Sequence, residues 1–230
     1  GAAGLTGSPE LSFEFPKIPN IDQFEYNNFK SVTNKVDIYR QSSGESDVYA
    51  IIIEPLNASS LQSCDEAFLR SLRKLCDDEK IVLIFDEVYT GWAKTGELFY
   101  FMHFDNLIPD IVTMAKSLGG GKASIAGYVA RDEIFRQAYD NLNDATLHST
   151  TYFGFGEETV TAIEAINITL EEDYVSKSKD IYNILNMGLK NLQKKYPKII
   201  SEVRGSGSLN GIILNSRLNS ITSIMKLIPS

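Results

Sequence analysis

The amino-acid sequence predicts an α/β protein with a mainly parallel sheet covered by helices on both faces. Val48–Ile53 and Ile81–Asp86 are continuous apolar runs rich in β-branched residues, a pattern typical of strands buried on both faces. Between them, apolar residues from Phe68 to Cys76 recur at helical spacing. Because a strand, a helix and a strand joined by short connections form a βαβ unit, the two strands are expected to run parallel.

The remaining elements follow from the same periodicities and from turn residues. Residues 1–23 are rich in Gly and Pro and are expected to be loop, and the polar stretch to Asp47 holds at most one short helix. Ser63–Glu66 has the form of a capping box that opens the first long helix. The later elements are strands Ile111–Met114 and Ile125–Ala130, helices Asp132–Tyr139, Glu157–Glu171 and Tyr174–Tyr196, and strands Ile199–Val203 and Gly211–Leu214. We expect residues 1–155 to form part of a large ligand-binding domain, 156–196 a helical connection and 197–230 the beginning of a small C-terminal domain.

Composition argues against several classes of protein. The 230 residues are enough for a substantial core, and 43% apolar with 23% charged residues is ordinary for a globular protein. The net charge is −8 without a long basic stretch, which argues against nucleic-acid binding. No apolar run approaches the ~20 residues of a membrane span and no leader opens the chain, so we expect a cytoplasmic protein without a membrane partner. Cys64 and Cys76 are expected to be buried, reduced thiols, and the Cys and His spacing indicates no metal site.

Three charged residues follow predicted strands: Glu54, Asp86 and Lys116. The carboxyl ends of parallel strands share one edge of a sheet, where ligands bind, so these side chains are expected to converge. An amine and a carboxylate placed in this way suit pyridoxal phosphate, which needs a lysine for a Schiff base and an acidic partner for its ring nitrogen. Each residue alone has a plain structural alternative: a solvated loop lysine, a turn-capping aspartate or a solvated acid before Pro55.

The run Ile81–Glu87 also has the form of the acidic motif of P-loop ATPases, which gives an alternative function. That function requires a G-x-x-x-x-G-K-[ST] loop, usually upstream. The nearest segment, Gly119–Ser124, lies downstream and has Ala123 where the magnesium-binding hydroxyl belongs. Lys116 stands where the first glycine of the loop should be, so the ATPase is the weaker hypothesis.

Four segments together resemble one enzyme family: "AIIIEP", "LCDDEKIVLIFDEVYTGWAKTGELF", "PDIVTMAKSLGGG" and "HSTTYFG". In this order and at these separations they closely resemble the class III aminotransferases, the pyridoxal-phosphate family of acetylornithine, ornithine and 4-aminobutyrate aminotransferases. The resemblance extends to "EVRGSGSLNGIIL" near the end of the chain. It implies a fold-type-I α/β fold and a homodimer. It also implies amino-group transfer from an amine or amino acid to a 2-oxo acid by a ping-pong route.

The resemblance implies roles for the residues around the two strand ends. Lys116 matches the lysine that forms the internal aldimine with pyridoxal phosphate and moves protons. Asp86 matches the partner of the ring nitrogen, since a negative charge there keeps that nitrogen protonated. Val88 matches the residue packed on the ring face, and Glu87 and Tyr89 complete the predicted cofactor-binding set.

Other matching positions lie further along the chain. Thr151 matches the threonine that binds the cofactor phosphate across the dimer interface. Thr150 matches its neighbour at the substrate, and Glu54 matches an active-site glutamate. Related chemistries of the family, aminomutation and decarboxylation, stay open.

The sequence also departs from the family pattern. Tyr89 stands where Gln is common, Ser59 replaces a glutamate that in some members pairs with a substrate-gating arginine, and Lys94 stands where Arg is usual. The family's upstream Gly-Ser/Thr loop, stacking aromatic residue and downstream substrate arginine match no segment here. We therefore expect a fragment or truncated product, and a non-catalytic remnant of the fold is the first alternative function, ahead of the ATPase.

Overall fold

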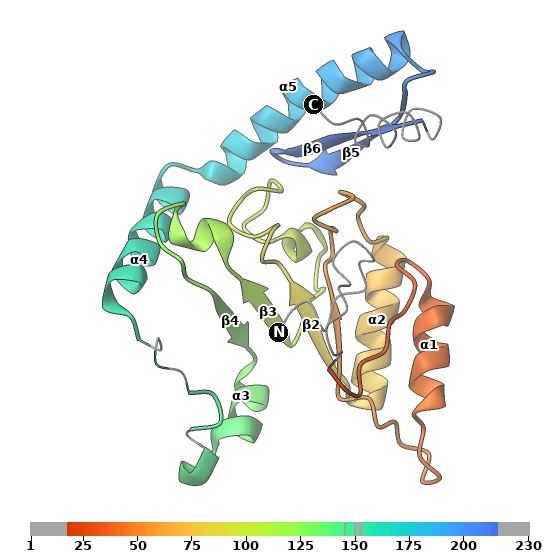
Figure 1. Cartoon of the computed structure of the whole chain (residues 1–230), viewed down its shortest axis with the longest axis vertical. Helices are drawn as coiled ribbons and strands as arrows, with labels where there is room; N and C mark the ends of the chain where they lie inside the picture. Colours follow the sequence, from red (N-terminus) through yellow and green to blue (C-terminus); the bar gives the residue numbers. More distant parts are fainter. Residues whose placement is uncertain (1–17, 145, 150, 152–153, 216–230) are drawn as a thin grey trace, which may run out of the picture.

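The computed structural model describes residues 18–144, 146–149, 151 and 154–215. It contains a four-stranded sheet flanked by helices and, beyond one end of that sheet, a two-stranded sheet packed against a long helix (Figure 1). No helix in this described part of the chain is long and apolar enough to cross a membrane.

The larger sheet has the strand order β1-β2-β3-β4. Strands β1 (Ala50–Ile53), β2 (Val82–Asp86) and β3 (Ile111–Met114) run parallel, and β4 (Gly127–Ala130) pairs with β3 in the antiparallel direction. The sheet is therefore mainly parallel, as expected. The parallel strands end at the same edge, which faces the two-stranded sheet in Figure 1.

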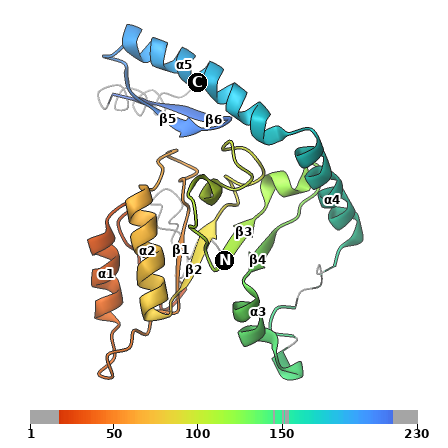
Figure 2. The ribbon, with the colours of Figure 1, turned by 180° about the vertical axis from the view of Figure 1, so that it is seen from behind.

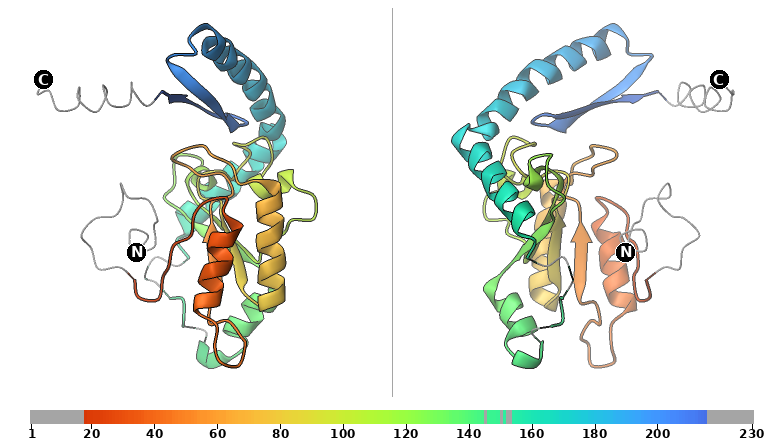
Figure 3. Two further views of the ribbon diagram at one scale, coloured as in Figure 1. Left: turned by 90° about the vertical axis from the view of Figure 1, so that its right-hand side faces the viewer. Right: turned by 60° about the vertical axis from the view of Figure 1, so that its left-hand side comes forward.

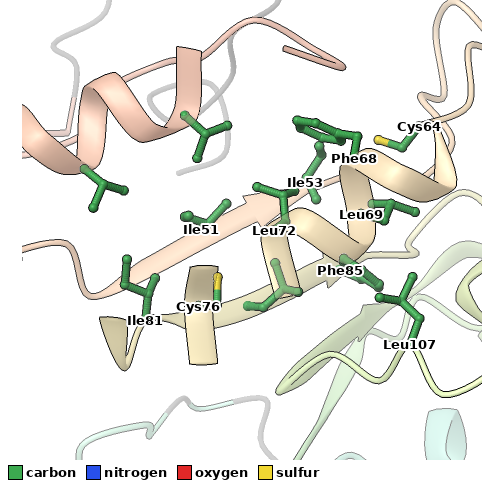
Figure 4. Close-up of a cluster of buried hydrophobic side chains, with 13 residues drawn as sticks. Ile51, Ile53, Cys64, Phe68, Leu69, Leu72, Cys76, Ile81, Phe85 and Leu107 are labelled. Atoms are coloured by element: carbon green, nitrogen blue, oxygen red, sulfur yellow. The ribbon is translucent and has the colours of Figure 1, made fainter. Parts of the chain in front are cut away.

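Two helices, α1 (Phe29–Ile38) and α2 (Glu66–Glu79), cover one face of the sheet. The core between them is continuous, and Figure 4 shows α2 side chains lying over those of β1 and β2. The buried members of this core are Val32, Val36, Ile51, Ile53, Cys64, Phe68, Leu69, Leu72, Cys76, Ile81, Leu83, Phe85 and Leu107. Both cysteines are free thiols within it, as the sequence predicts.

The opposite face of β1 is not covered in the described part of the chain. Its strand residues alternate between exposed and buried, and the Ile52 side chain is 48% exposed. The two sides of β1 therefore differ within the described residues: one packs under α1 and α2, and the other is open. A continuous apolar run does not reveal which of its two faces the same chain covers.

Helix α2 begins later than the capping box predicts. Its N-cap is Asp65, whose side chain makes no capping hydrogen bond. Ser63 is instead held in an isolated antiparallel bridge with Leu56, and its carbonyl oxygen accepts from Asn27 Nδ2 at 3.0 Å. Tertiary pairing of Ser63 therefore replaces the local cap that the sequence favours.

A buried carboxylate ties α2 to the strands. Asp110 Oδ2 accepts from Leu83 N at 2.7 Å and from Arg73 Nη1 at 2.9 Å, while Arg131 Nε lies 3.4 Å from Asp110 Oδ1. Asp110 immediately precedes β3, so these contacts fix the entry of β3 beside β2.

The rest of the chain forms short turns and a second unit, which comprises residues 174–214. The elements are η3 (Tyr100–His103), η4 (Lys116–Gly119), α3 (Asp132–Tyr139), η5 (Leu142–Asp144), α4 (Gly156–Glu171), α5 (Tyr174–Lys195), β5 (Ile200–Ser206) and β6 (Leu209–Leu214). Helix α4 contacts η4 at the side of the larger sheet (Figure 2). Helix α5 packs on the β5–β6 hairpin above the carboxyl ends of the parallel strands (Figure 3). The expected division at residues 155 and 196 stays a prediction.

Candidate functional site

Three charged residues meet at the carboxyl ends of the parallel strands. Glu54 follows β1, Asp86 ends β2 and Lys116 begins η4 after β3. Burial raises the pKa of Glu54, and the Asp86 charge adds to this effect. The hydrogen bond from Ala58 N, at 2.8 Å, and the Lys116 charge act in the opposite direction on that pKa. Glu54 therefore lies within electrostatic reach of both other groups.

Asp86 is fixed through one of its two carboxylate oxygens. Its Oδ1 accepts from Val88 N at 3.0 Å and from Thr113 Oγ1 at 3.2 Å. Thr113 is the residue that pairs with Asp86 in the β2–β3 register. Asp86 Oδ2 receives no hydrogen bond from the residues that the structure describes, so one oxygen of a half-buried, oriented carboxylate is left for a ligand.

Lys116 is exposed and has a backbone φ of +47°, in the left-handed region. Such a conformation is uncommon for a residue with a Cβ and persists only where the surroundings enforce it. Its ammonium makes no hydrogen bond or ion pair with the described residues and lies 5.9 Å from the centre of the Tyr89 ring. Lys116 is thus a free amine on a constrained turn.

A second lysine flanks the same ring. Lys94 Nζ lies 5.5 Å from the centre of the Tyr89 ring and donates to Ser117 Oγ at 3.0 Å. Burial lowers the pKa of Lys94 to about 8, and the neighbouring Lys116 charge adds to this lowering while Glu87 opposes it. In the sequence, Lys94 stands out only as a departure from a family pattern, which does not place it in the site. Its place is set by a loop in which Trp92 and Ala93 both have a φ of +65°, which spacing does not reveal.

Glu87 is held by hydrogen bonds from the loop that follows it. Its side chain is fully buried, and its carboxylate accepts from Thr90 Oγ1 at 2.6 Å and from the backbone N atoms of Tyr100 and Phe101, each at 2.8 Å. Glu87 therefore holds the loop after β2 to η3. Its predicted place in the cofactor-binding set stays a prediction.

Of the two predicted threonines, only Thr151 is among the described residues. Thr151 is exposed in the turn before α4. Thr150 lies outside the described residues. The P-loop hypothesis receives no structural support, because Gly119–Ser124 leads into β4 and not into a helix.

A cavity of about 900 Å³ adjoins the site. It lies between the loop at residues 92–94, the glycine-rich turn at 117–122, α4 and α5. Lys94 and Ser117 line it, whereas Glu54, Asp86 and Lys116 do not. The cavity therefore adjoins the cluster of Glu54, Asp86 and Lys116 through two neighbouring residues, Lys94 and Ser117.

The donors at the strand ends fit pyridoxal phosphate. The cofactor needs a primary amine for its aldehyde and an acidic acceptor for its protonated ring nitrogen. Lys116 supplies an amine without a hydrogen bond to the described residues, and Asp86 Oδ2 supplies an oriented acceptor. Asp86 ends β2, and Lys116 begins the η4 turn that follows the neighbouring parallel strand β3.

Comparisons with known proteins identify the family of the chain. The sequence model of the family described as aminotransferase class-III matches residues 5–227. A transaminase from the marine bacterium Virgibacillus has 26% identity and a TM-score of 0.84, with 98% of this chain and 53% of that chain covered. An ornithine aminotransferase from Toxoplasma gondii ME49 has 22% identity and a TM-score of 0.81, with 98% and 52% covered.

An (S)-enantioselective omega-transaminase from Thermomicrobium roseum has 23% identity and a TM-score of 0.82, with 94% of this chain and 51% of that chain covered. The chain thus spans about half the length of the solved structures that it matches. The family match covers nearly the whole of the present sequence. The chain belongs to the class-III aminotransferase family.

Proposed function

We propose that this chain carries the cofactor-binding core of a pyridoxal-phosphate-dependent aminotransferase. The observation that carries the proposal is the free amine of Lys116 beside the oriented carboxylate of Asp86 at the ends of adjacent strands. The substrates are an amine or amino acid as donor and a 2-oxo acid as acceptor, which bind in turn at one site. Family membership supports this reaction class.

Each residue has a distinct task in the proposed site. When bound, pyridoxal phosphate supplies an aldehyde and an electron-withdrawing ring. Lys116 would hold the cofactor through its amine and would carry protons at its Nζ atom. Asp86 keeps the ring nitrogen protonated through its negative charge. Val88 and Tyr89 contact the ring, and Glu54 faces the substrate side.

The assembly and location are part of the same proposal. Thr151 binds the cofactor phosphate of a second copy, so the enzyme is a homodimer, and its exposure before α4 supports this role. Thr150 lies beside the substrate. The two free, buried thiols support a cytoplasmic location. Residues 1–155, 156–196 and 197–230 are the large domain, the connection and the start of the small domain.

Covalent trapping tests the assignment of Lys116. The chain is incubated with pyridoxal phosphate, reduced with borohydride, digested and analysed by mass spectrometry. We expect the label on Lys116 and its loss in Lys116→Arg, because the guanidinium does not form the Schiff base. Lys122→Arg is the matched control, since Lys122 lies in the same glycine-rich turn, and it should keep the label. A label found mainly on Lys94 or Lys122 would refute the assignment.

Amino transfer from a panel of ω-amino donors to 2-oxoglutarate is measured on the same preparation. Saturable transfer that is lost in Lys116→Arg supports the enzyme. Labelling of Lys116 without transfer to any acceptor would instead favour a non-catalytic member of the fold.

A further inference from the structure

The backbone carbonyl of Lys94 is the main contact point for the second unit. Its oxygen accepts from Ser208 N at 2.8 Å, from Ser208 Oγ at 3.0 Å and from Ser178 Oγ at 3.0 Å. Ser208 lies at the tip of the β5–β6 hairpin and Ser178 lies on α5. The adjacent Thr95 carbonyl accepts from Ser206 Oγ at 2.7 Å. The carbonyl oxygens of residues 94 and 95 therefore accept four of the hydrogen bonds by which the hairpin and α5 dock.

The docking depends on a close approach of backbones. Gly207 has a φ of +56°, and a Cβ atom there would lie 2.4 Å from both Lys94 O and Thr95 C. Only glycine fits this position without a shift of the hairpin or of the loop. The loop itself is strained, because Trp92 and Ala93 have positive φ, so its shape is held by these surrounding contacts.

The side chain of Lys94 extends in the other direction, toward the candidate site. Its ammonium donates to Ser117 Oγ and lies over the Tyr89 ring. Ser117 directly follows Lys116 in the η4 turn. One residue thus joins the second unit, through its carbonyl, to the turn that carries Lys116, through its ammonium.

The ammonium of Lys94 is costly to keep in this place. Burial and the Lys116 charge lower its pKa to about 8, against 10.5 for an ordinary lysine. A pKa that is lowered on folding means that the charged form opposes folding below pH 8 and that this cost disappears as the pH rises toward 10.5. An apolar side chain of similar length would avoid that cost, so global stability does not account for a lysine here.

We propose that Lys94 is a positioning residue, which transmits the docking of the β5–β6 hairpin to Lys116 by fixing Ser117 and the Tyr89 ring. The idea that Lys116 and Tyr89 serve pyridoxal phosphate rests on the proposed function. The positioning itself does not, because every contact in it belongs to the chain alone.

Amide hydrogen exchange on the chain without cofactor tests the proposal. The amides of Leu118 and Gly120 report on the η4 turn, since they donate to Ala115 O and Ser117 O at 3.0 Å each. In Lys94→Met we expect their protection factors to fall about tenfold, as the loss of one hydrogen bond to a charged group implies. Lys94→Arg should retain most of the protection. Lys122→Met should leave the protection unchanged, because the Lys122 ammonium of the parent chain makes no hydrogen bond with the described residues.

Thermal unfolding at pH 7 separates positioning from a purely structural role. The midpoint of Lys94→Met should equal or exceed that of the parent chain, because the buried ammonium opposes folding at this pH. Parent-like protection at Leu118 and Gly120 in Lys94→Met would overturn the proposal. A lower midpoint with protection lost throughout the chain would also overturn it. If borohydride fails to label Lys116 while the exchange result holds, the proposed function fails and the positioning role stands.

The pH dependence gives a second readout. The charged groups that act on Lys94 are Lys116 from η4 and Glu87 from the loop after β2. The same cavity is also lined by charged residues of the glycine-rich turn, α4 and α5: Lys122, Glu164 and Lys177. As the pH rises through about 8, Lys94 loses its charge, so protection of Gly120 should fall in the parent chain. In Lys94→Arg the guanidinium stays charged, and protection should persist. The same fall in both proteins would contradict the role of the Lys94 ammonium.

Discussion

The backbone of Lys116 is held in a fixed conformation, whereas its long side chain is exposed. With a φ of +47°, the residue starts a 3₁₀ turn directly after a buried strand, so its Cα is fixed while its ammonium is exposed. A flexible four-carbon stem on a fixed base reaches a ligand and withdraws from it without a change in the fold. This combination suits a residue that alternates between a covalent bond and proton transfer.

Asp86→Asn separates charge from geometry in the candidate site. The amide oxygen of Asn accepts from Val88 N and Thr113 Oγ1 as Asp86 Oδ1 does, so the fold should persist. Loss of the negative charge should leave pyridoxal phosphate bound and lower amino transfer roughly ten- to a hundredfold, the equivalent of one hydrogen bond to a charged group.

The measurements for Asp86→Asn are kcat, KM and cofactor occupancy. Thr113→Val is the matched control, because it removes a hydroxyl donor from Asp86 and keeps the charge, and it should have the smaller effect. Unchanged kcat in Asp86→Asn would place the partner of the ring nitrogen elsewhere.

At the level of single residues, the sequence predicted which strand-end residues meet, but it did not predict the hydrogen bonds of Glu87. Glu54, Asp86 and Lys116 were predicted to meet because they end parallel strands, and the structure brings them within electrostatic reach. Glu87 was placed beside Asp86 in the predicted site, but it accepts three hydrogen bonds in the core. The donors come from residues 90, 100 and 101, and no local pattern shows that this loop folds back on Glu87.

Among the elements, strands and long helices followed from periodicity, whereas some of their boundaries and the cover of β1 did not. β3 and α3 have the bounds that the sequence predicts. The predicted cap of α2 was wrong, because Ser63 pairs with Leu56 instead. The alternation of exposed and buried residues in β1 depends on which segments pack over it, and this information is not contained in an unbroken apolar run.

The contacts of Asp110 predict a strong effect on the larger sheet. Asp110→Ala removes the buried partner of Arg73, which keeps only its exposed partner Asp77, and takes the Asp110 acceptor from the buried Leu83 amide. The free energy of unfolding in urea should fall by about 3–5 kcal/mol, as for a broken buried ion pair. Asp132→Ala is the control, since it breaks the exposed pair with Arg136 and should cost less than about 1 kcal/mol. Equal losses would show that burial of the Asp110 pair is unimportant.

The whole molecule is organised around two loops that both meet the second unit. The loop after β1 contacts it through Arg204 Nη1, which donates to Ser60 O at 3.4 Å, and Leu61 packs against Gly211. The loop after β2 contacts it through the Lys94 carbonyl. Each loop starts at a residue of the candidate site, so a shift of the hairpin acts on both strand ends together.

Gly207→Ala tests the seam, by which we mean the contact of the β5–β6 hairpin with residues 94 and 95. The added Cβ would meet Lys94 O and Thr95 C at 2.4 Å, so the hairpin should separate from the larger sheet. We expect unfolding to lose cooperativity and limited proteolysis to cut near residue 95 sooner. Gly44→Ala is the matched control, because Gly44 also has a positive φ, +91°, and nothing lies within 4 Å of its added Cβ. Similar behaviour of the two variants would show that backbone strain alone, and not the seam, explains the effect.

At this scale the sequence indicated that a second unit begins late in the chain, but not how it docks. Both strands of the hairpin were predicted, with β5 and β6 longer than expected. The docking depends on hydrogen bonds between Lys94 and Ser208, which are far apart in the sequence and carry no local signature. Long-range seams of this kind become visible only in the folded chain.

The buried thiols have a practical consequence for measuring any motion of the β5–β6 hairpin relative to the larger sheet. Cys64 and Cys76 are 3% and 1% exposed, and burial raises the pKa of each to about 12. Thiolates are therefore scarce near neutral pH, and maleimide reagents should leave both cysteines unmodified. A cysteine introduced on exposed Glu202 or Asp132 would then be the one reactive handle in the folded protein. A pair of fluorescent dyes at these two positions would report the distance between the hairpin and the sheet in solution without any replacement of native cysteines.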